Sequence, residues 1–182
     1  MALTSAQLAT LKAAILADNT LNAFPNTDNG NGDLANALNA IASPDWLVWQ
    51  TAVPVDAISD AITWANFTPQ DTPDNTVTWS NRSLACQGKQ FNLQTMLVGR
   101  STLDASKSNL RAGLQDALTA IPSGASGASK NGGWANVQAI LSRKAKLIEK
   151  ILSTGTGSQA TPATMGYEGT VTGDDVTRAR NT

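Results

Sequence analysis

Large apolar residues recur at intervals of three, four and seven over most of the first 152 positions, which is the spacing of one face of a helix. Thr4 and Gln7 form a capping box directly before such a series, so we predict a helix over residues 5–18. Strand-like alternation of apolar and polar residues is rare. Further helices are predicted to begin after Asp33, at Ser43-Pro44, at Pro54 and after Ser106, and to run over 81–99 and 134–153. The sequence therefore predicts a mainly α protein, a small helical bundle with long loops.

Turn-forming residues separate the predicted helices. Residues 26–32 are predicted to form a turn-rich loop that ends where Asp33 caps a short helix. Residues 66–80 hold two prolines and predict a long surface loop, in which weak alternation near Val77 and Trp79 indicates an edge strand. Residues 123–133 are small and polar and predict a linker.

The composition changes at Ser153, after which Gly, Thr and Ser dominate and large apolar residues are few. Such a segment buries too little surface to fold alone. We therefore predict a helical core domain over 1–152 and an extended C-terminal arm over 153–182. Met165, Tyr167 and Val171 alternate in the arm, a pattern that can add a strand to another chain's sheet, although a disordered tail is an open alternative. Arg178 and Arg180 are further interface candidates in the arm.

The chain has no His and a single cysteine, Cys86. Without His there is no Ser-His-Asp or Cys-His nucleophile pair and no HExxH zinc site. One cysteine forms no internal disulfide, which favours synthesis in the cytosol. The amino terminus has no signal-peptide pattern, and no apolar run approaches the roughly 20 residues that span a bilayer. We expect neither secretion by a signal peptide nor a membrane span.

Four patterns resemble chemical motifs but lack residues that the corresponding chemistry requires. The carboxylate pairs Asp56/Asp60 and Asp174/Asp175 have no accompanying base or phosphate loop, so we interpret them as surface charge. Residues 124–131 depart from a phosphate-binding loop at two positions. In a calcium loop whose first ligand is Asn29, Leu34 stands in place of the turn glycine and Ala40 in place of the closing glutamate. We predict no enzyme activity, no catalytic residue, no metal and no cofactor.

The near-zero net charge of −1 hides an asymmetry along the chain. Residues 1–81 carry eight acids and one base, whereas residues 82–152 carry ten bases and three acids. This polarity suits nucleic-acid contact, head-to-tail packing of copies, or an internal match across one core. In the predicted helix over 134–153, Lys144, Lys146 and Lys150 join Arg143 as candidates for facing DNA or a neighbouring subunit.

Five of the nine aromatic residues are tryptophans, and Trp46 and Trp49 lie close together in the acidic half. Tryptophan is favoured where a large apolar surface must also donate a hydrogen bond, as at interface hot spots. Trp46 and Trp49 are therefore interface candidates, and the core of a loop-rich region is an equal alternative.

Several stretches together resemble a family of small virion proteins of tailed bacteriophages. They are Met1-Ala-Leu-Thr-Ser-Ala-Gln-Leu-Ala-Thr-Leu-Lys12, Ala42-Ser-Pro-Asp-Trp-Leu-Val-Trp-Gln-Thr51, Asp60-Ala-Ile-Thr-Trp64, Phe91-Asn-Leu-Gln-Thr-Met-Leu97 and Thr154-Gly-Thr-Gly-Ser-Gln-Ala-Thr-Pro-Ala-Thr-Met-Gly-Tyr-Glu-Gly169. None of these stretches is a catalytic motif.

The resemblance implies a head-to-tail connector adaptor, assembled in the host cytoplasm and located in the virion neck. Such adaptors are largely helical, form a homo-oligomeric ring of about twelve copies below the portal protein, and dock on it through a C-terminal arm. The implied partners are the portal, the next neck or tail protein and, non-specifically, the packaged DNA, with no membrane partner. The alternatives are another virion role, such as head closure, tail termination or capsid decoration, and a non-virion DNA-packaging accessory protein.

Overall fold

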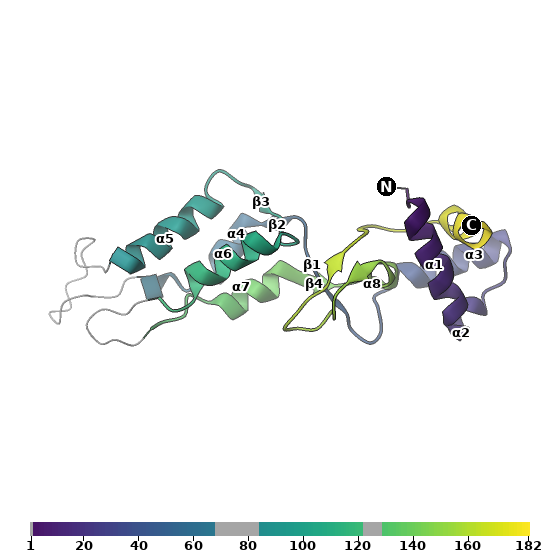
Figure 1. Ribbon diagram of the computed structural model, residues 1–182, viewed down its shortest axis with the longest axis horizontal. Helices are drawn as coiled ribbons and strands as arrows, with labels where there is room; N and C mark the ends of the chain where they lie inside the picture. The colour runs from purple at the N-terminus through teal and green to yellow at the C-terminus, as the bar shows by residue number, and fades with distance from the viewer. Residues whose placement is uncertain (1, 68–83, 122–128) are drawn as a thin grey trace. The chain divides into compact units, whose positions relative to one another are not determined.

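The computed structural model describes residues 2–67, 84–121 and 129–182. The chain divides into two compact units: unit 1 combines residues 1–49 with residues 143–182, and unit 2 comprises residues 50–142. Helices dominate both units, which confirms the mainly α class (Figure 1). Most of the predicted loop at 66–80, with its edge strand, and most of the predicted linker at 123–133 lie outside the described residues.

Unit 1 begins with the predicted helix, α1 (Ser5–Ala17), whose capping box is present. The Thr4 N–H donates to Gln7 Oε1 at 2.9 Å, and the Gln7 N–H donates to Thr4 Oγ1 at 3.3 Å. A short helix, α2 (Asn19–Asn22), follows, and then α3 (Asp28–Asn39) begins after its cap Thr27. The predicted turn-rich loop at 26–32 is therefore wrong from Asp28 onward, because the Thr27 hydroxyl accepts from the Gly30 N–H and starts the helix five residues earlier than Asp33.

The residues of the predicted C-terminal arm fold into unit 1. They form β5 (Ser153–Thr154), β6 (Thr164–Met165) and α9 (Gly173–Asn181), and β5 pairs with β6 in antiparallel register. Helix α9 packs against α3 and α1, so that the two ends of the chain lie in the same unit (Figure 1). Tyr167, Val171, Val176 and Ala179 are buried in the same core as the leucines of α1 and α3.

The predicted division into a 1–152 core and a free 153–182 arm is therefore wrong. A segment poor in apolar residues cannot fold alone, but this one adds its few large side chains to a core that the amino-terminal helices have already built. Its polar groups are also paired: Asn39 Nδ2 donates to Val171 O at 2.8 Å, and the Val171 N–H donates to Asn39 Oδ1 at 2.9 Å.

Residues 47–49 form a strand, β1 (Leu47–Trp49), and not part of the predicted helix that begins at Pro44. The partner of β1 is the C-terminal segment as well as β4 (Ser142–Lys144). The Leu47 N–H donates to Gly157 O at 2.8 Å, the Ala163 N–H donates to Leu47 O at 2.8 Å, and the Trp49 N–H donates to Ala163 O at 3.0 Å. These long-range backbone hydrogen bonds override the local helix signal.

The predicted long helix over 134–153 is two helices, α7 (Trp134–Leu141) in unit 2 and α8 (Leu147–Ile151) in unit 1. The break between them is where the chain passes from one unit to the other. Helix α8 has its own cap, because the Glu149 carboxylate accepts a 2.9 Å hydrogen bond from the Lys146 N–H. The apolar residues of this stretch thus divide between two cores.

Unit 2 contains β2 (Val53–Pro54), α4 (Val55–Ala61), a 3-10 turn η1 (Trp64–Phe67), α5 (Leu84–Leu97), β3 (Thr102–Leu103), α6 (Ser108–Leu118) and α7. The predicted helices at Pro54, over 81–99 and after Ser106 correspond to α4, α5 and α6. Helix α5 packs on α6 and α4 packs on α7, while β2 pairs with β3 in antiparallel register. The core contains Ile58, Phe67, Leu93, Leu114 and Leu118.

The division into units also removes the charge asymmetry of the sequence. Unit 1 contains eight acids and seven bases, and unit 2 contains six of each, because unit 1 joins the acidic amino-terminal segment to the basic residues after position 142. Of the interpretations that the sequence left open, the match of acidic and basic segments within one core describes unit 1.

Candidate interface surfaces

The alternating residues of the C-terminal segment are part of this chain's own core. Tyr167 is 5% exposed and Val171 is 3% exposed, and Met165 packs against Val48 and Ala163. The Tyr167 hydroxyl donates to Thr170 O. Burial raises the pKa of Tyr167, and the carboxylates of Asp175 and Glu149 raise it further. The structure buries Tyr167 and Val171 in unit 1 and packs the partly buried Met165 against the same unit.

The two arginines of α9 differ in their surroundings. The Arg178 side chain is half exposed and lies 3.5 Å from Asp175 on the same helix. Arg180 reaches across to the segment between α2 and α3, where its guanidinium donates to Phe24 O at 2.9 Å, Pro25 O at 2.9 Å and Asn31 Oδ1 at 2.7 Å. Arg180 thus connects α9 to the segment between α2 and α3 and to the start of α3.

The predicted basic helix does not present its lysines as one surface. Lys144 pairs with Asp45 at 2.7 Å, and both side chains are exposed. Lys146 Nζ donates to Gly169 O at 3.0 Å. Lys150 Nζ lies 5.3 Å from the centre of the Trp46 ring, a cation–π contact. Each lysine that the sequence assigns to DNA or to a neighbour has a partner within unit 1.

Arg143 forms a buried ion pair that sequence reasoning missed. Its guanidinium donates to both carboxylate oxygens of Glu149, at 2.7 and 2.9 Å, and to Glu168 at 3.1 Å. The Glu149 side chain is only 1% exposed and also accepts the N–H groups of Lys146 and Gly169. Burial alone would raise the pKa of Glu149, but the Arg143 hydrogen bonds, the backbone donors and the Arg143 charge together lower it. The cluster joins the start of α8 to the C-terminal segment.

The two tryptophan candidates are structural in unit 1. Trp49 is 6% exposed. Trp46 is half-buried, and its Nε1 donates to Ser153 Oγ at 3.0 Å. Gly157 adopts a φ of +61° against the Trp46 ring, where a Cβ atom would come within 2.2 Å of the indole. The Trp46 indole contacts the C-terminal segment and Trp49 is buried, which agrees with the core alternative.

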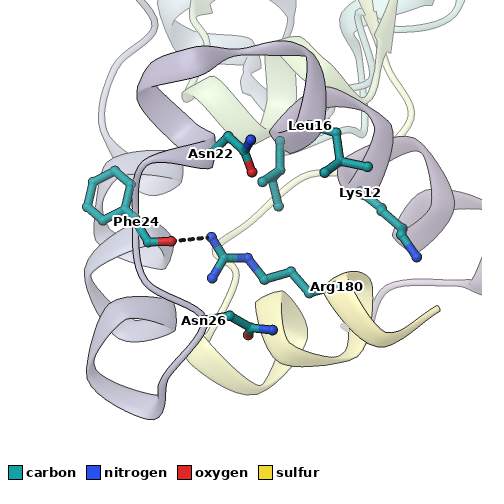
Figure 2. A pocket seen from close by; sticks show the side chains of 7 residues that line it. Lys12, Leu16, Asn22, Phe24, Asn26 and Arg180 are labelled. Atoms are coloured by element: carbon teal, nitrogen blue, oxygen red, sulfur yellow. Dashed lines mark hydrogen bonds between the residues drawn. The ribbon is translucent and has the colours of Figure 1, made fainter.

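A hollow of about 290 Å³ opens on unit 1 beside α1, α2 and α9. Figure 2 shows the Arg180 side chain crossing it toward the Phe24 carbonyl, with Leu16 and Lys12 of α1 on the opposite side. Leu16 is 60% exposed, and Lys12 makes no hydrogen bond or ion pair with the described residues. The two cations carry the only formal charges of the lining, and the amides of Asn22 and Asn26 complete its polar part.

Helix α5 of unit 2 has two apolar faces, and one of them is exposed. Leu93 and Leu97 are buried, whereas Phe91 is 67% exposed and Val98, just after the helix, is 76% exposed. The seven-residue spacing of Phe91 and Val98 was a helix signal in the sequence, yet it marks the solvent side. The exposed positions from 88 to 99 are all uncharged: Gly88, Phe91, Asn92, Gln94, Thr95, Val98 and Gly99. The sequence signal for this face was the scarcity of charge, since Lys89 is the single charged residue of α5.

Comparisons of the chain with models of protein families, with curated proteins and with solved structures find no match. Within the described residues, no three or more His, Cys, Asp or Glu side chains are grouped so that they could hold a metal ion. No helix among these residues is long and apolar enough to cross a membrane. The most distinctive surfaces are the uncharged α5 face and the cationic hollow of unit 1.

Proposed function

We propose that this protein is a structural subunit of a tailed-bacteriophage virion, assembled as a ring in the head-to-tail connector. The resemblance of five sequence stretches to phage virion proteins supports the setting. The observation that carries an assembly role is the exposed face of α5, with Phe91 and Val98 seven residues apart and every exposed position from 88 to 99 uncharged.

The α5 face has the composition of a protein interface. The centre of an interface is depleted of charged residues and enriched in aromatic ones, whereas the exposed face of a helix that remains in water usually carries Lys, Glu or Arg. A phenylalanine that is 67% exposed buries a large apolar area when a partner covers it. The face therefore supports a protein that functions by binding other subunits, and the proposal assigns it no catalytic role.

The proposal places docking on folded surfaces. Residues 153–182 are part of unit 1, so contact with the portal protein and with the next neck or tail protein would use the outside of this unit and of unit 2. Because Lys144, Lys146 and Lys150 have partners within unit 1, the proposal assigns them no contact with packaged DNA.

The test is the copy number and position of the protein in purified particles, by quantitative mass spectrometry and cryo-electron microscopy. The proposal expects about a dozen copies at one vertex, as in a single closed ring. Hundreds of copies over the shell would indicate decoration. Absence from the particle would overturn the virion role and favour a packaging accessory protein, whose DNA affinity would fall steeply with salt.

A further inference from the structure

A closed ring needs two different surfaces on each subunit, because a rotation that generates more than two copies joins one patch to another. The exposed face of α5 belongs to unit 2 and the cationic hollow belongs to unit 1. We infer that Phe91 of one copy inserts into the Lys12–Leu16–Arg180 hollow of the next copy. This inference rests on the proposed ring, and it names the contact that would close it.

The size of the hollow suits a phenyl ring. A cavity of about 150 Å³ accepts benzene, and the hollow measures about 290 Å³. Leu16, which is 60% exposed on the rim, supplies an apolar contact for the ring. Covering Leu16 and Phe91 together removes two of the largest exposed apolar side chains from water.

The charges of the two surfaces are also compatible. Lys12 and Arg180 present cations to the hollow, and cations are attracted to the face of an aromatic ring. The donors of Arg180 are directed to the carbonyl oxygens of Phe24 and Pro25 and to Asn31 Oδ1. A guanidinium held in this way by its edges can still stack on an aromatic ring through its planar face.

The uncharged surroundings of Phe91 remove the desolvation cost that a charged helix face would impose on this contact. Thr95 lies one turn after Phe91 on the same exposed face, and its hydroxyl donates to Phe91 O at 2.9 Å. Gly88 lies one turn before it, and a Cβ atom there would meet nothing within 4 Å. Small residues on both sides leave Phe91 as the projecting group of the face.

The second hollow of unit 1 is a poorer receptor. It measures about 360 Å³ and is lined by Asp18, Trp46 and Lys150, among others. Its lysine already lies over the Trp46 ring, and its aspartate would be desolvated by a phenyl group. The observations therefore favour the hollow that contains Arg180.

Engineered cysteines test this contact in the full-length protein. The native Cys86 is fully buried, so two new cysteines report on the surface. Asn22→Cys on the hollow and Thr95→Cys beside Phe91 are made as separate variants, mixed and oxidised mildly. The inference expects a disulfide-linked heterodimer in the mixture. Adding Phe91→Ala to the Thr95→Cys variant should reduce it at least about tenfold, the effect of losing a hot-spot side chain.

Thr10→Cys, which lies on an exposed part of α1 outside the hollow, is the matched control and should not cross-link with Thr95→Cys. If Thr95→Cys alone forms homodimers more readily than the mixture forms heterodimers, α5 pairs with α5 and the inference is overturned. Absence of any cross-link in the mixture also overturns it. The copy number in purified particles is a separate result. About a dozen copies per particle together with no cross-link would support the proposed ring but show that its subunits meet through other surfaces.

Discussion

The buried Glu149 carboxylate gives the sharpest stability prediction. Arg143 and Glu149 meet at 2.7 Å with Glu149 1% exposed, and the next residue along the chain, Lys144, meets Asp45 at the same 2.7 Å with both side chains more than half exposed. The chain thus contains two ion pairs of equal length that differ in burial. Comparing them tests how much more a buried carboxylate contributes, together with the hydrogen bonds that it accepts, than an exposed one.

Glu149→Ala should lower the free energy of unfolding of unit 1 by about 3–5 kcal/mol, because it leaves a half-buried guanidinium without its main partner and two N–H donors without their acceptor. Arg143 retains Glu168 at 3.1 Å, which moderates the loss. Asp45→Ala should cost at most about 1 kcal/mol, the usual value for an exposed pair. A typical domain has about 5–15 kcal/mol in total, so the first change is severe and the second is mild.

Urea denaturation followed by circular dichroism gives the free energies, and hydrogen exchange of peptides from α8 and the C-terminal segment locates the loss. We expect the exchange rates of unit 1 to rise in Glu149→Ala and those of unit 2 to change little. Equal costs for Glu149→Ala and Asp45→Ala, within about 0.5 kcal/mol, would refute the reasoning that burial decides the contribution of the pair.

Three further predictions concern the same unit. The pKa of Glu149 in the folded state lies below its ordinary value of 4.5, so the stability that it contributes is present above that value and is lost as the pH falls through the lowered pKa. Glu149→Gln should flatten this acidic part of the curve of unfolding free energy against pH. An unchanged curve at acidic pH would contradict the contribution assigned to the Glu149 carboxylate. Deleting residues 153–182 should unfold unit 1, since each large buried side chain of the segment contributes about 1.5–3 kcal/mol, and a dichroism spectrum with α1 and α3 intact would show that the segment is dispensable. Gly30→Ala should destabilise unit 1 by about 1–3 kcal/mol, because its Cβ would lie 2.2 Å from Pro25 O. Gly32→Ala, whose Cβ meets nothing within 4 Å, should stabilise unit 1 by up to about 1 kcal/mol. Equal urea midpoints for the two variants would contradict the difference in space at the two glycines.

Local signals in the sequence located the helices that begin at a recognisable cap or carry apolar residues at helical spacing. The capping box of Thr4 and Gln7 fixed the start of α1, and the spacing of apolar residues located α4, α5 and α6. These elements are predictable because a cap and a face depend on residues within one or two turns of each other. Composition alone likewise excluded histidine-dependent nucleophile pairs and an internal disulfide, because the chain has no His and one cysteine.

The candidate surfaces were only partly predictable. Arg180 was selected as an interface residue, and it does line the hollow, but Lys12 and Leu16 come from α1 and approach it only when α9 packs there. Phe91 and Val98 were visible as a helical repeat, and their spacing is the same whether that face points inward or outward. Helix α5 packs on α6 and buries Leu93 and Leu97, and this packing decides which face is left in water.

Tertiary structure alone decided the fate of residues 153–182. Their composition is that of a segment that cannot fold by itself, and this remains true of the isolated segment. In the chain, β1 supplies backbone partners to Gly157 and Ala163, and the core of α1 and α3 accepts Tyr167 and Val171. These contacts join residues more than 100 positions apart, so no local pattern records them. The sequence by itself determined which segments can be helices, and the long-range contacts decided that the last thirty residues complete a core.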